Sequence, residues 1–274
     1  MREFSALNGR IQGVRWGKGR PVLAFHGLLD NAMSFQPLAQ HLVDWEIWAI
    51  DLPGHGRSAA LPGSGGWSLP DWLPVLGDLL DDLGWPEYDI LGHSLGGILS
   101  QMLATLDARI QRLWSLDALG PITDSDAGNL DRLQRIYDRR LKPASRRRHY
   151  AHPDLLWQAR TAGRFPLSEP SARLLSRRGV GLDAEGWFFN YDRRLRQENN
   201  WRLSEDQVLA MLQRLPCPLH LAVFADSPLG DEARLTARKE AVPELHLTTF
   251  AGGHHAHMET PEPIAQWLQS TDNT

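Results

Sequence analysis

The stretch YDILGHSLGG, residues 88–97, constrains the fold more than any other part of the chain. Residues 88–92 have the length and apolar character of a buried strand, and an apolar helical pattern begins at residue 95. Only two residues separate them, so the chain must turn sharply and Ser94 must take a strained backbone conformation. Gly92 and Gly96 remove side chains that would collide with Ser94 and with each other. The pattern predicts an exposed hydroxyl between a strand and a helix.

This arrangement, G-x-S-x-G between a strand and a helix, is a nucleophile elbow. The helix dipole and the Leu95 N–H would favour negative charge beside the Ser94 hydroxyl. A serine hydroxyl is a weak nucleophile until a base removes its proton, so the pattern also requires a histidine from elsewhere in the chain.

Further apolar runs predict the rest of the sheet. They alternate with helical patterns, which predicts right-handed βαβ units and an α/β fold with a mostly parallel, doubly wound sheet. Asn8-Gly9 between two extended segments predicts an opening hairpin. The expected strands are 21–25, 45–51, 88–92, 112–117, 218–226 and 245–250, and the expected helices are 68–85, 95–106, 204–215 and 261–270.

The alternation is interrupted between residues 121 and 203. This segment holds seventeen Lys/Arg and ten Asp/Glu, a net charge of +7, which leaves −11 for the remainder of a chain of net charge −4. We therefore expect a mostly helical cap at 121–203, inserted after the sixth strand, and a core formed by 1–120 and 204–274. Either the arginines of segment 121–203 form a solvated face, or some of them contact an anionic substrate.

Composition limits the class of protein. The 274 residues suffice for one large domain, and the single cysteine, Cys217, excludes an internal disulfide and fits a reducing compartment. No run approaches the roughly 20 apolar residues of a membrane span, and the N-terminus lacks the apolar run of a signal peptide. We expect a cytoplasmic protein that binds neither membranes nor nucleic acid.

The general base is expected after the last strand. His254 follows two glycines that let the backbone bend toward Ser94, with His255 and His257 as competitors. This histidine cluster could instead be simply solvated or form a surface metal site. A third metal ligand is missing nearby in the sequence, so we predict no metal.

The loop after strand 21–25 should complete the site. The Leu28 N–H is placed to form an oxyanion hole with the Leu95 N–H, and Gly27 permits close backbone approach. His26 flanks this hole, and we expect it to act mainly as a structural hydrogen-bonding group. His26, Gly27 and His93 are expected next to the substrate.

Four segments in this order resemble the α/β-hydrolase superfamily: HGLLDNAMSF (26–35), DLPGHGRS (51–58), GHSLGG (92–97) and GGHHAHMETPEP (252–263). LDNAMSF, SLDALGP (115–121), YDRRL (191–195) and GGHHAHM resemble its serine hydrolase-like branch. The resemblance implies cofactor-free, ester-type hydrolysis, with Ser94 as nucleophile, His254 as base, His257 in a supporting position, and Leu28 and Leu95 as oxyanion donors.

The acid of the triad departs from the commonest pattern of that family, in which it follows the seventh strand. Asp226 stands near that position but not at it. Asp117 stands at the end of the sixth strand, facing the crevice, where a residue that holds a histidine would be placed. We expect Asp117 to be the acid, with Asp226 as the alternative.

The predicted protein is a carboxylesterase-type serine hydrolase acting on a small-molecule ester or acyl substrate, as a monomer or homodimer. A thioesterase, a carbon–carbon bond hydrolase and a non-catalytic binding protein are the alternatives. Trp187 and Phe188 are expected to contact substrate. They belong to a set of aromatic residues that could line an acyl pocket or form the cap's own core: Trp157, Phe165, Trp187, Phe188, Phe189 and Tyr191.

Overall fold

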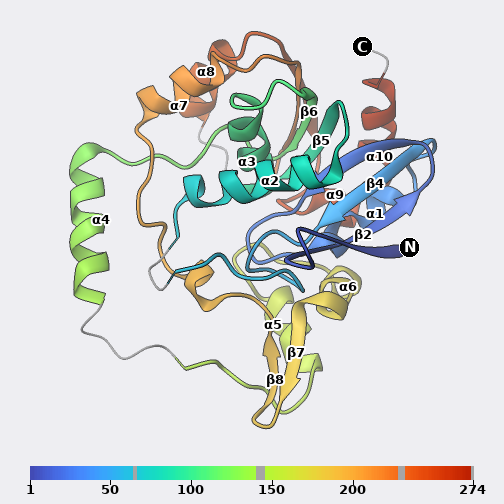
Figure 1. Cartoon of the computed structure of the whole chain (residues 1–274), viewed down its shortest axis with the longest axis vertical. Helices are drawn as coiled ribbons and strands as arrows, with labels where there is room; N and C mark the ends of the chain where they lie inside the picture. Colours follow the sequence, from blue (N-terminus) through green and yellow to red (C-terminus); the bar gives the residue numbers. More distant parts are fainter. Residues whose placement is uncertain (64–66, 140–145, 228–231, 273–274) are drawn as a thin grey trace.

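The computed structural model describes residues 1–63, 67–139, 146–227 and 232–272 (Figure 1). Its centre is an eight-stranded sheet in the order β1-β2-β4-β3-β5-β6-β9-β10. β2 is antiparallel to β1 and β4, and the other pairs are parallel, which confirms the mostly parallel sheet and the opening hairpin. The strands are β1 (Arg2–Ala6), β2 (Ile11–Gly17), β3 (Arg20–Phe25), β4 (Trp45–Ile50), β5 (Tyr88–His93), β6 (Ile110–Leu116), β9 (Leu219–Phe224) and β10 (Leu245–Phe250).

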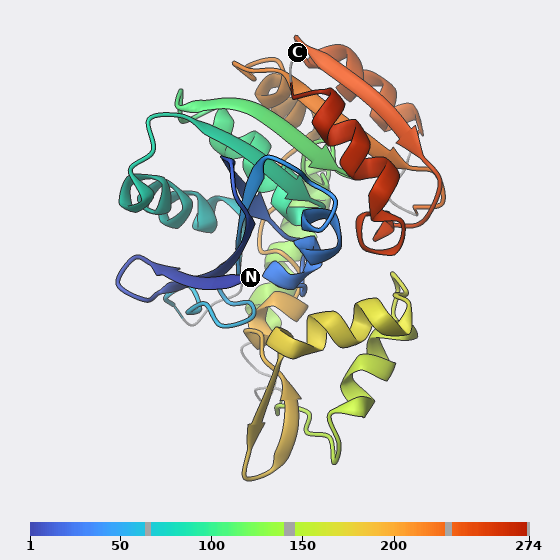
Figure 2. The same cartoon turned by 90° about the vertical axis from the view of Figure 1, so that its right-hand side faces the viewer.

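Helices cover both faces of this sheet (Figures 1 and 2). Side chains that alternate along β3 enter two apolar clusters: Leu23 and Phe25 join one, and Val22 and Ala24 join the other. The first cluster lies under η2 (Leu69–Trp72), α2 (Leu73–Leu83), α3 (Leu95–Ala104), α7 (Glu205–Leu212) and α8 (Glu232–Ala241). The second lies under η1 (Ala32–Phe35), α1 (Gln36–Ala39), α9 (Ala256–Glu259) and α10 (Pro261–Ser270).

None of the described helices has the length and apolarity needed to cross a membrane.

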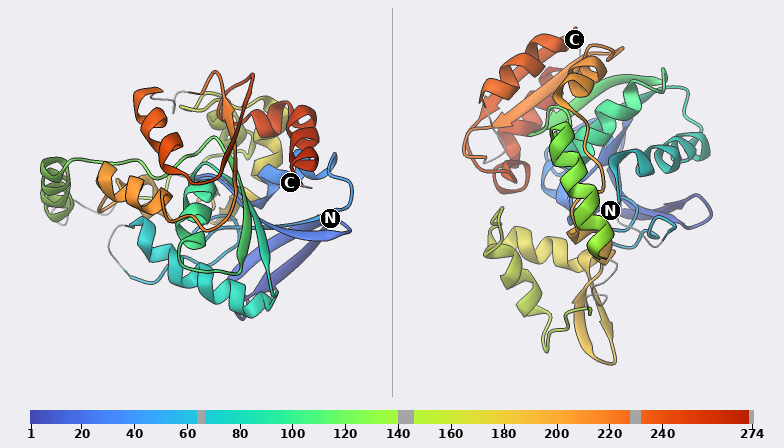
Figure 3. Two further views of the ribbon diagram at one scale, coloured as in Figure 1. Left: turned by 90° about the horizontal axis from the view of Figure 1, so that it is seen from above. Right: turned by 90° about the vertical axis from the view of Figure 1, so that its left-hand side faces the viewer.

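The segment between β6 and α7 contains helices and one hairpin. Its elements are α4 (Asp126–Arg139), α5 (Asp154–Thr161), α6 (Glu169–Gly179), β7 (Val180–Asp183), β8 (Gly186–Phe189) and η3 (Arg193–Arg196). α5, α6 and the hairpin lie together below the sheet, whereas α4 lies to one side (Figures 1 and 3). The expectation of a mostly helical segment missed the antiparallel β7–β8 hairpin, because four-residue strands are too short to show alternation.

The two glycines around Ser94 are required by backbone contacts. A Cβ on Gly92 would lie 2.5 Å from the Cα of Gly97, and a Cβ on Gly96 would overlap the Phe25 carbonyl of β3. The sequence predicts collisions with the serine and between the two added side chains, but the collisions arise because α3 begins directly against β3 and β5. Ser94 has φ 51° and ψ −116°, a strained conformation for a residue with a side chain.

We expect Gly96→Ala to lower the free energy of unfolding by about 2–4 kcal/mol or to prevent folding, because the new methyl group meets backbone that cannot move aside. Gly77→Ala in α2 is the matched control. A Cβ there has no atom within 4 Å, so the change should stabilise the helix by about 0.5–1 kcal/mol. Urea unfolding of both variants measures this, and equal stabilities would contradict it.

Candidate active site

Ser94 lies at the carboxyl end of β5, where its half-buried hydroxyl faces a histidine. The Ser94 Oγ is 2.9 Å from Nε2 of His254, which comes from the loop after β10. The turn is fastened to the neighbouring strand, because the Ser94 N–H donates to the Leu116 carbonyl at 2.9 Å. Two segments separated by 160 residues are therefore brought together at one edge of the sheet.

The second ring nitrogen of His254 faces a carboxylate. Nδ1 is 2.6 Å from Oδ2 of Asp117, which directly follows β6, and both side chains are buried. With the Nδ1–H donated to Asp117, Nε2 carries a lone pair toward the Ser94 hydroxyl. The three side chains thus form one hydrogen-bonded chain.

The backbone around Asp117 holds its carboxylate in place. Asp117 has a positive φ of 57°, its N–H donates to the Ala222 carbonyl at 2.7 Å, and its Oδ1 accepts the Phe224 N–H at 3.2 Å. Both partner groups, one acceptor and one donor, belong to β9, the next strand of the sheet. The alternative acid, Asp226, is exposed and accepts the Gly252 N–H at 3.2 Å, so it closes a turn instead. The structure brings Asp117 to His254, and Asp226 is not among the partners of that ring.

The loop after β3 places the Leu28 N–H between two constrained residues. Asp30 donates its N–H to the Gly27 carbonyl at 3.1 Å, and Leu29 has a positive φ of 64°. The Leu95 N–H belongs to the first residue of α3, where backbone donors lack helical partners. Within the described ranges, neither the Leu28 nor the Leu95 N–H donates to a protein acceptor.

His26 and His93 are buried rings that hold loops in place. Both are fully buried. Nε2 of His26 accepts the Leu52 N–H at 2.9 Å, while its Nδ1 is 2.7 Å from the Gly27 carbonyl. His93 donates from Nε2 to the His254 carbonyl at 2.8 Å. Their hydrogen bonds to backbone groups give both rings an internal role, and contact with substrate stays a prediction. Gly27 is also buried, and a Cβ on it would lie 2.9 Å from Nδ1 of His93.

His255 and His257, the alternatives to His254 as the base, pack among buried side chains. The His257 ring is 4.1 Å from the His93 ring, centroid to centroid, and neither of its nitrogens has a hydrogen-bond partner in the described part of the chain. His255 instead places Nε2 3.2 Å from Oδ2 of Asp30. Burial lowers the pKa of both His93 and His257 well below its usual value, so both rings are neutral at pH 7. Among the described residues no set of three side chains is arranged to hold a metal ion.

Phe165, an aromatic residue of the segment between β6 and α7, packs against His254. The Phe165 ring is 4.4 Å from the His254 ring, centroid to centroid. Trp187 and Phe188 have other neighbours: Trp187 exchanges backbone hydrogen bonds with Tyr150, and Phe188 packs under Arg147. Those two residues serve the β7–β8 hairpin, and the structure gives them no contact with Ser94 or His254.

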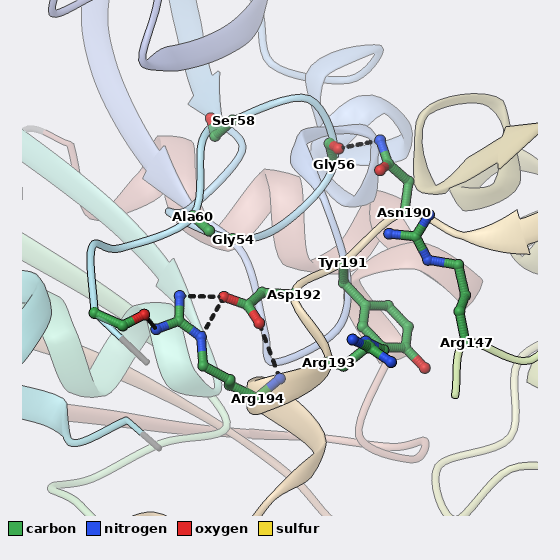
Figure 4. Close-up of a pocket in the computed structure, with 11 residues that line it drawn as sticks. Gly54, Gly56, Ser58, Ala60, Arg147, Asn190, Tyr191, Asp192, Arg193 and Arg194 are labelled. Carbon is green, nitrogen blue, oxygen red and sulfur yellow. Dashed lines mark hydrogen bonds and ion pairs between the residues drawn. The ribbon is translucent and has the colours of Figure 1, made fainter. Parts of the chain in front are cut away.

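A cavity of about 430 Å³ lies elsewhere, between the loop after β4 and residues 190–194 (Figure 4). Ser94 and His254 do not line it. Arg194, on its wall, is paired with Asp192 at 2.8 Å, and Arg147 stacks on Phe188. These partners favour the solvated-face interpretation of the arginines, and contact with an anionic substrate stays a prediction.

Known proteins are similar to this chain over most of its length. Residues 20–261 match the family described as the alpha/beta hydrolase fold. The chain belongs to this family. It is 29% identical to a probable serine hydrolase of Drosophila melanogaster over 94% of this chain and 82% of that protein, and 28% identical to a serine hydrolase-like protein of Danio rerio over 97% and 88%. These relatives place this α/β hydrolase in the serine hydrolase-like branch.

A solved structure shows the same fold at higher identity. A hypothetical protein of Pseudomonas aeruginosa PAO1 is 32% identical, with a TM-score of 0.85 over 94% of this α/β hydrolase and 91% of that chain. In the sequence nothing separates Phe165 from five other aromatic residues of the same segment, and Asp30 stands out only as part of a motif. Their contacts with the histidines depend on segments distant in sequence, so no local pattern could single them out.

We expect Asp117→Asn to slow the labelling of Ser94 by a fluorophosphonate probe on the order of 10³–10⁴-fold, because an amide no longer fixes the reactive tautomer of His254. Asp226→Asn is the matched control and should label at the wild-type rate, since Asp226 only closes an exposed turn. Intact-protein mass spectrometry over time measures both rates. Slow labelling of the Asp226 variant alone would assign the acid role to Asp226.

We expect the protein to lose stability below about pH 6.5, where histidines of the unfolded chain take up protons. Burial lowers the pKa of His55 to about 3, and His93 and His257 are shifted the same way. The unfolded state then binds more protons than the folded state, so each ring removes about 1.4 kcal/mol per pH unit down to its folded-state pKa. Urea midpoints from pH 7.5 to 5 measure this, and His257→Leu should make the dependence shallower.

Proposed function

We propose that this α/β hydrolase is a carboxylesterase-type enzyme that cleaves a small-molecule ester through an acyl-enzyme intermediate. The observation that carries the proposal is the hydrogen-bonded chain from Asp117 through His254 to Ser94, with distances of 2.6 and 2.9 Å. A histidine held by a carboxylate and facing a strained, partly exposed serine is the arrangement that acyl transfer requires.

In the first step Ser94 Oγ attacks the ester carbonyl carbon while Nε2 of His254 takes its proton. The negative charge that develops on the carbonyl oxygen is met by the Leu28 and Leu95 N–H groups, and Asp117 stabilises the imidazolium. The carbon–oxygen bond to the leaving group then breaks, and His254 gives the proton to the departing alcohol. Ser94 remains acylated.

In the second step a water molecule attacks the acyl carbon, with His254 again as the base. The same two N–H groups hold the oxyanion, and its collapse releases the carboxylic acid and returns the proton to Ser94. Neither step changes an oxidation state, and one water molecule is consumed per ester cleaved, so Ser94, His254 and Asp117 supply the nucleophile, the base and the acid of the cycle.

Residues 121–203 act as a cap over this chemistry in the proposed enzyme. The contact between Phe165 and His254 supports this, because it puts an apolar ring next to the reacting groups. An apolar wall suits the acyl part of a small ester and excludes water from the charged transition state.

The test uses p-nitrophenyl esters of increasing acyl length. We expect a burst of p-nitrophenol, one equivalent per protein, followed by slower turnover. Ser94→Ala should remove the burst and lower kcat by at least about 10³-fold, because the nucleophile is lost while binding is kept.

Equal rates for the wild type and Ser94→Ala would contradict the mechanism. Acyl thioesters run in parallel separate the main alternative: faster turnover of the thioester than of the oxygen ester with the same acyl group would make the protein a thioesterase on the same residues. Binding of esters without any Ser94-dependent turnover would favour a binding protein instead.

A further inference from the structure

A buried carboxylate behind the site joins three separate segments. Asp30 lies in the loop that carries the Leu28 N–H, and its side chain is 2% exposed. Its Oδ1 is ion-paired with Arg160 in the last turn of α5, and its Oδ2 is 3.2 Å from Nε2 of His255. One charge therefore connects the loop after β3, the inserted segment and the loop that carries His254.

Arg160 also holds the backbone of that loop. Its second terminal nitrogen donates to the Leu29 carbonyl at 3.0 Å, next to the residue whose N–H we assign to the oxyanion hole. Leu29 has a positive φ, so the turn is not one that the loop would take without support. The same stretch of chain places Phe165 on the His254 ring, four residues after α5 ends.

The charge of Asp30 is compensated mainly by Arg160. Burial by itself would raise the pKa of the Asp30 carboxyl, but Arg160, with His255 and His93, holds it well below its usual value. Without the guanidinium, Asp30 would keep only histidine partners, and its negative charge would lie in the same loop as the Leu28 N–H that we assign to the oxyanion hole. The groups that face Asp30 or feel its charge are Arg160, His255, His93, His26, His55 and His257.

We propose that Arg160 is a positioning residue for the reaction: through Asp30 and the Leu29 carbonyl it fixes the oxyanion loop against the His254 loop, and it cancels a carboxylate charge that would oppose the oxyanion. This rests on the proposed acyl-transfer function. It makes the inserted segment part of the catalytic geometry and not only a wall around the substrate.

The experiment measures kcat and KM with p-nitrophenyl acetate for wild type, Arg160→Met, Arg160→Lys, Asp30→Asn and the double variant Asp30→Asn/Arg160→Met. We expect Arg160→Met to lower kcat about 10–100-fold with KM changed less than about threefold, because orientation and charge, not binding, are lost. Arg160→Lys should recover part of kcat. Arg177→Met, an exposed arginine on α6, is the matched control and should keep the wild-type kcat.

Charge compensation predicts two further results. The double variant should have a higher kcat than Arg160→Met, because the unpaired carboxylate is gone. The ratio of Arg160→Met to wild-type kcat should also rise as the pH falls, because loss of Arg160 removes the largest influence that lowers the pKa of the buried Asp30 carboxyl, which then takes up a proton more readily. A merely structural role would lower the melting temperature without changing this ratio.

Three outcomes would overturn the inference. They are a wild-type kcat for Arg160→Met, an equal loss for Arg160→Met and Arg177→Met, and a loss that neither Asp30→Asn nor lower pH relieves. If Arg160→Met does not fold, Arg160→Gln and the double variant Asp30→Asn/Arg160→Gln give the same comparison, because glutamine also removes the positive charge. Absence of a Ser94-dependent burst in the wild type would instead overturn the proposed function itself, and the inference with it.

Discussion

The start of α3 lies so close to the backbone of β3 and β5 that residues 92 and 96 have no room for a side chain. This close approach lets the chain leave a strand and enter a helix without a loop, which forces Ser94 into its strained conformation. It also aims the first N–H of the helix toward the same place as the serine hydroxyl. The other parts of the site are arranged around this one point.

His254, the histidine that faces Ser94, packs against a group of buried histidine rings. His93 donates to the His254 carbonyl, and its ring packs on His254, His255 and His257. Neutral, buried imidazoles fill this space without adding charge next to the base. Because burial lowers the pKa of these rings, their protonation in acid favours the unfolded chain, so the geometry of the site and the acid tolerance of the protein depend on the same residues.

Much of the fold followed from the sequence, because its elements carry local signals. Apolar runs bounded by turn residues gave the parallel strands, and Asn8-Gly9 gave the opening hairpin, which pairs as expected. The short helices α1 and α9, and the β7–β8 hairpin, were missed because four residues are too few to establish a period. Trp187 and Phe188 were placed at the substrate because their aromatic character is visible in the sequence, whereas their neighbours are not.

The sequence by itself determined the turn at Ser94, since glycine spacing between a strand and a helix is a local property, and it narrowed the acid to Asp117 or Asp226. Only the tertiary structure decided which carboxylate reaches His254, because that depends on hydrogen bonds from β9 that hold Asp117 in a positive-φ conformation. It alone also brought Asp30, Arg160 and His255 together. A buried charge can be kept only where its partners converge in three dimensions, and these three residues come from segments up to 225 residues apart.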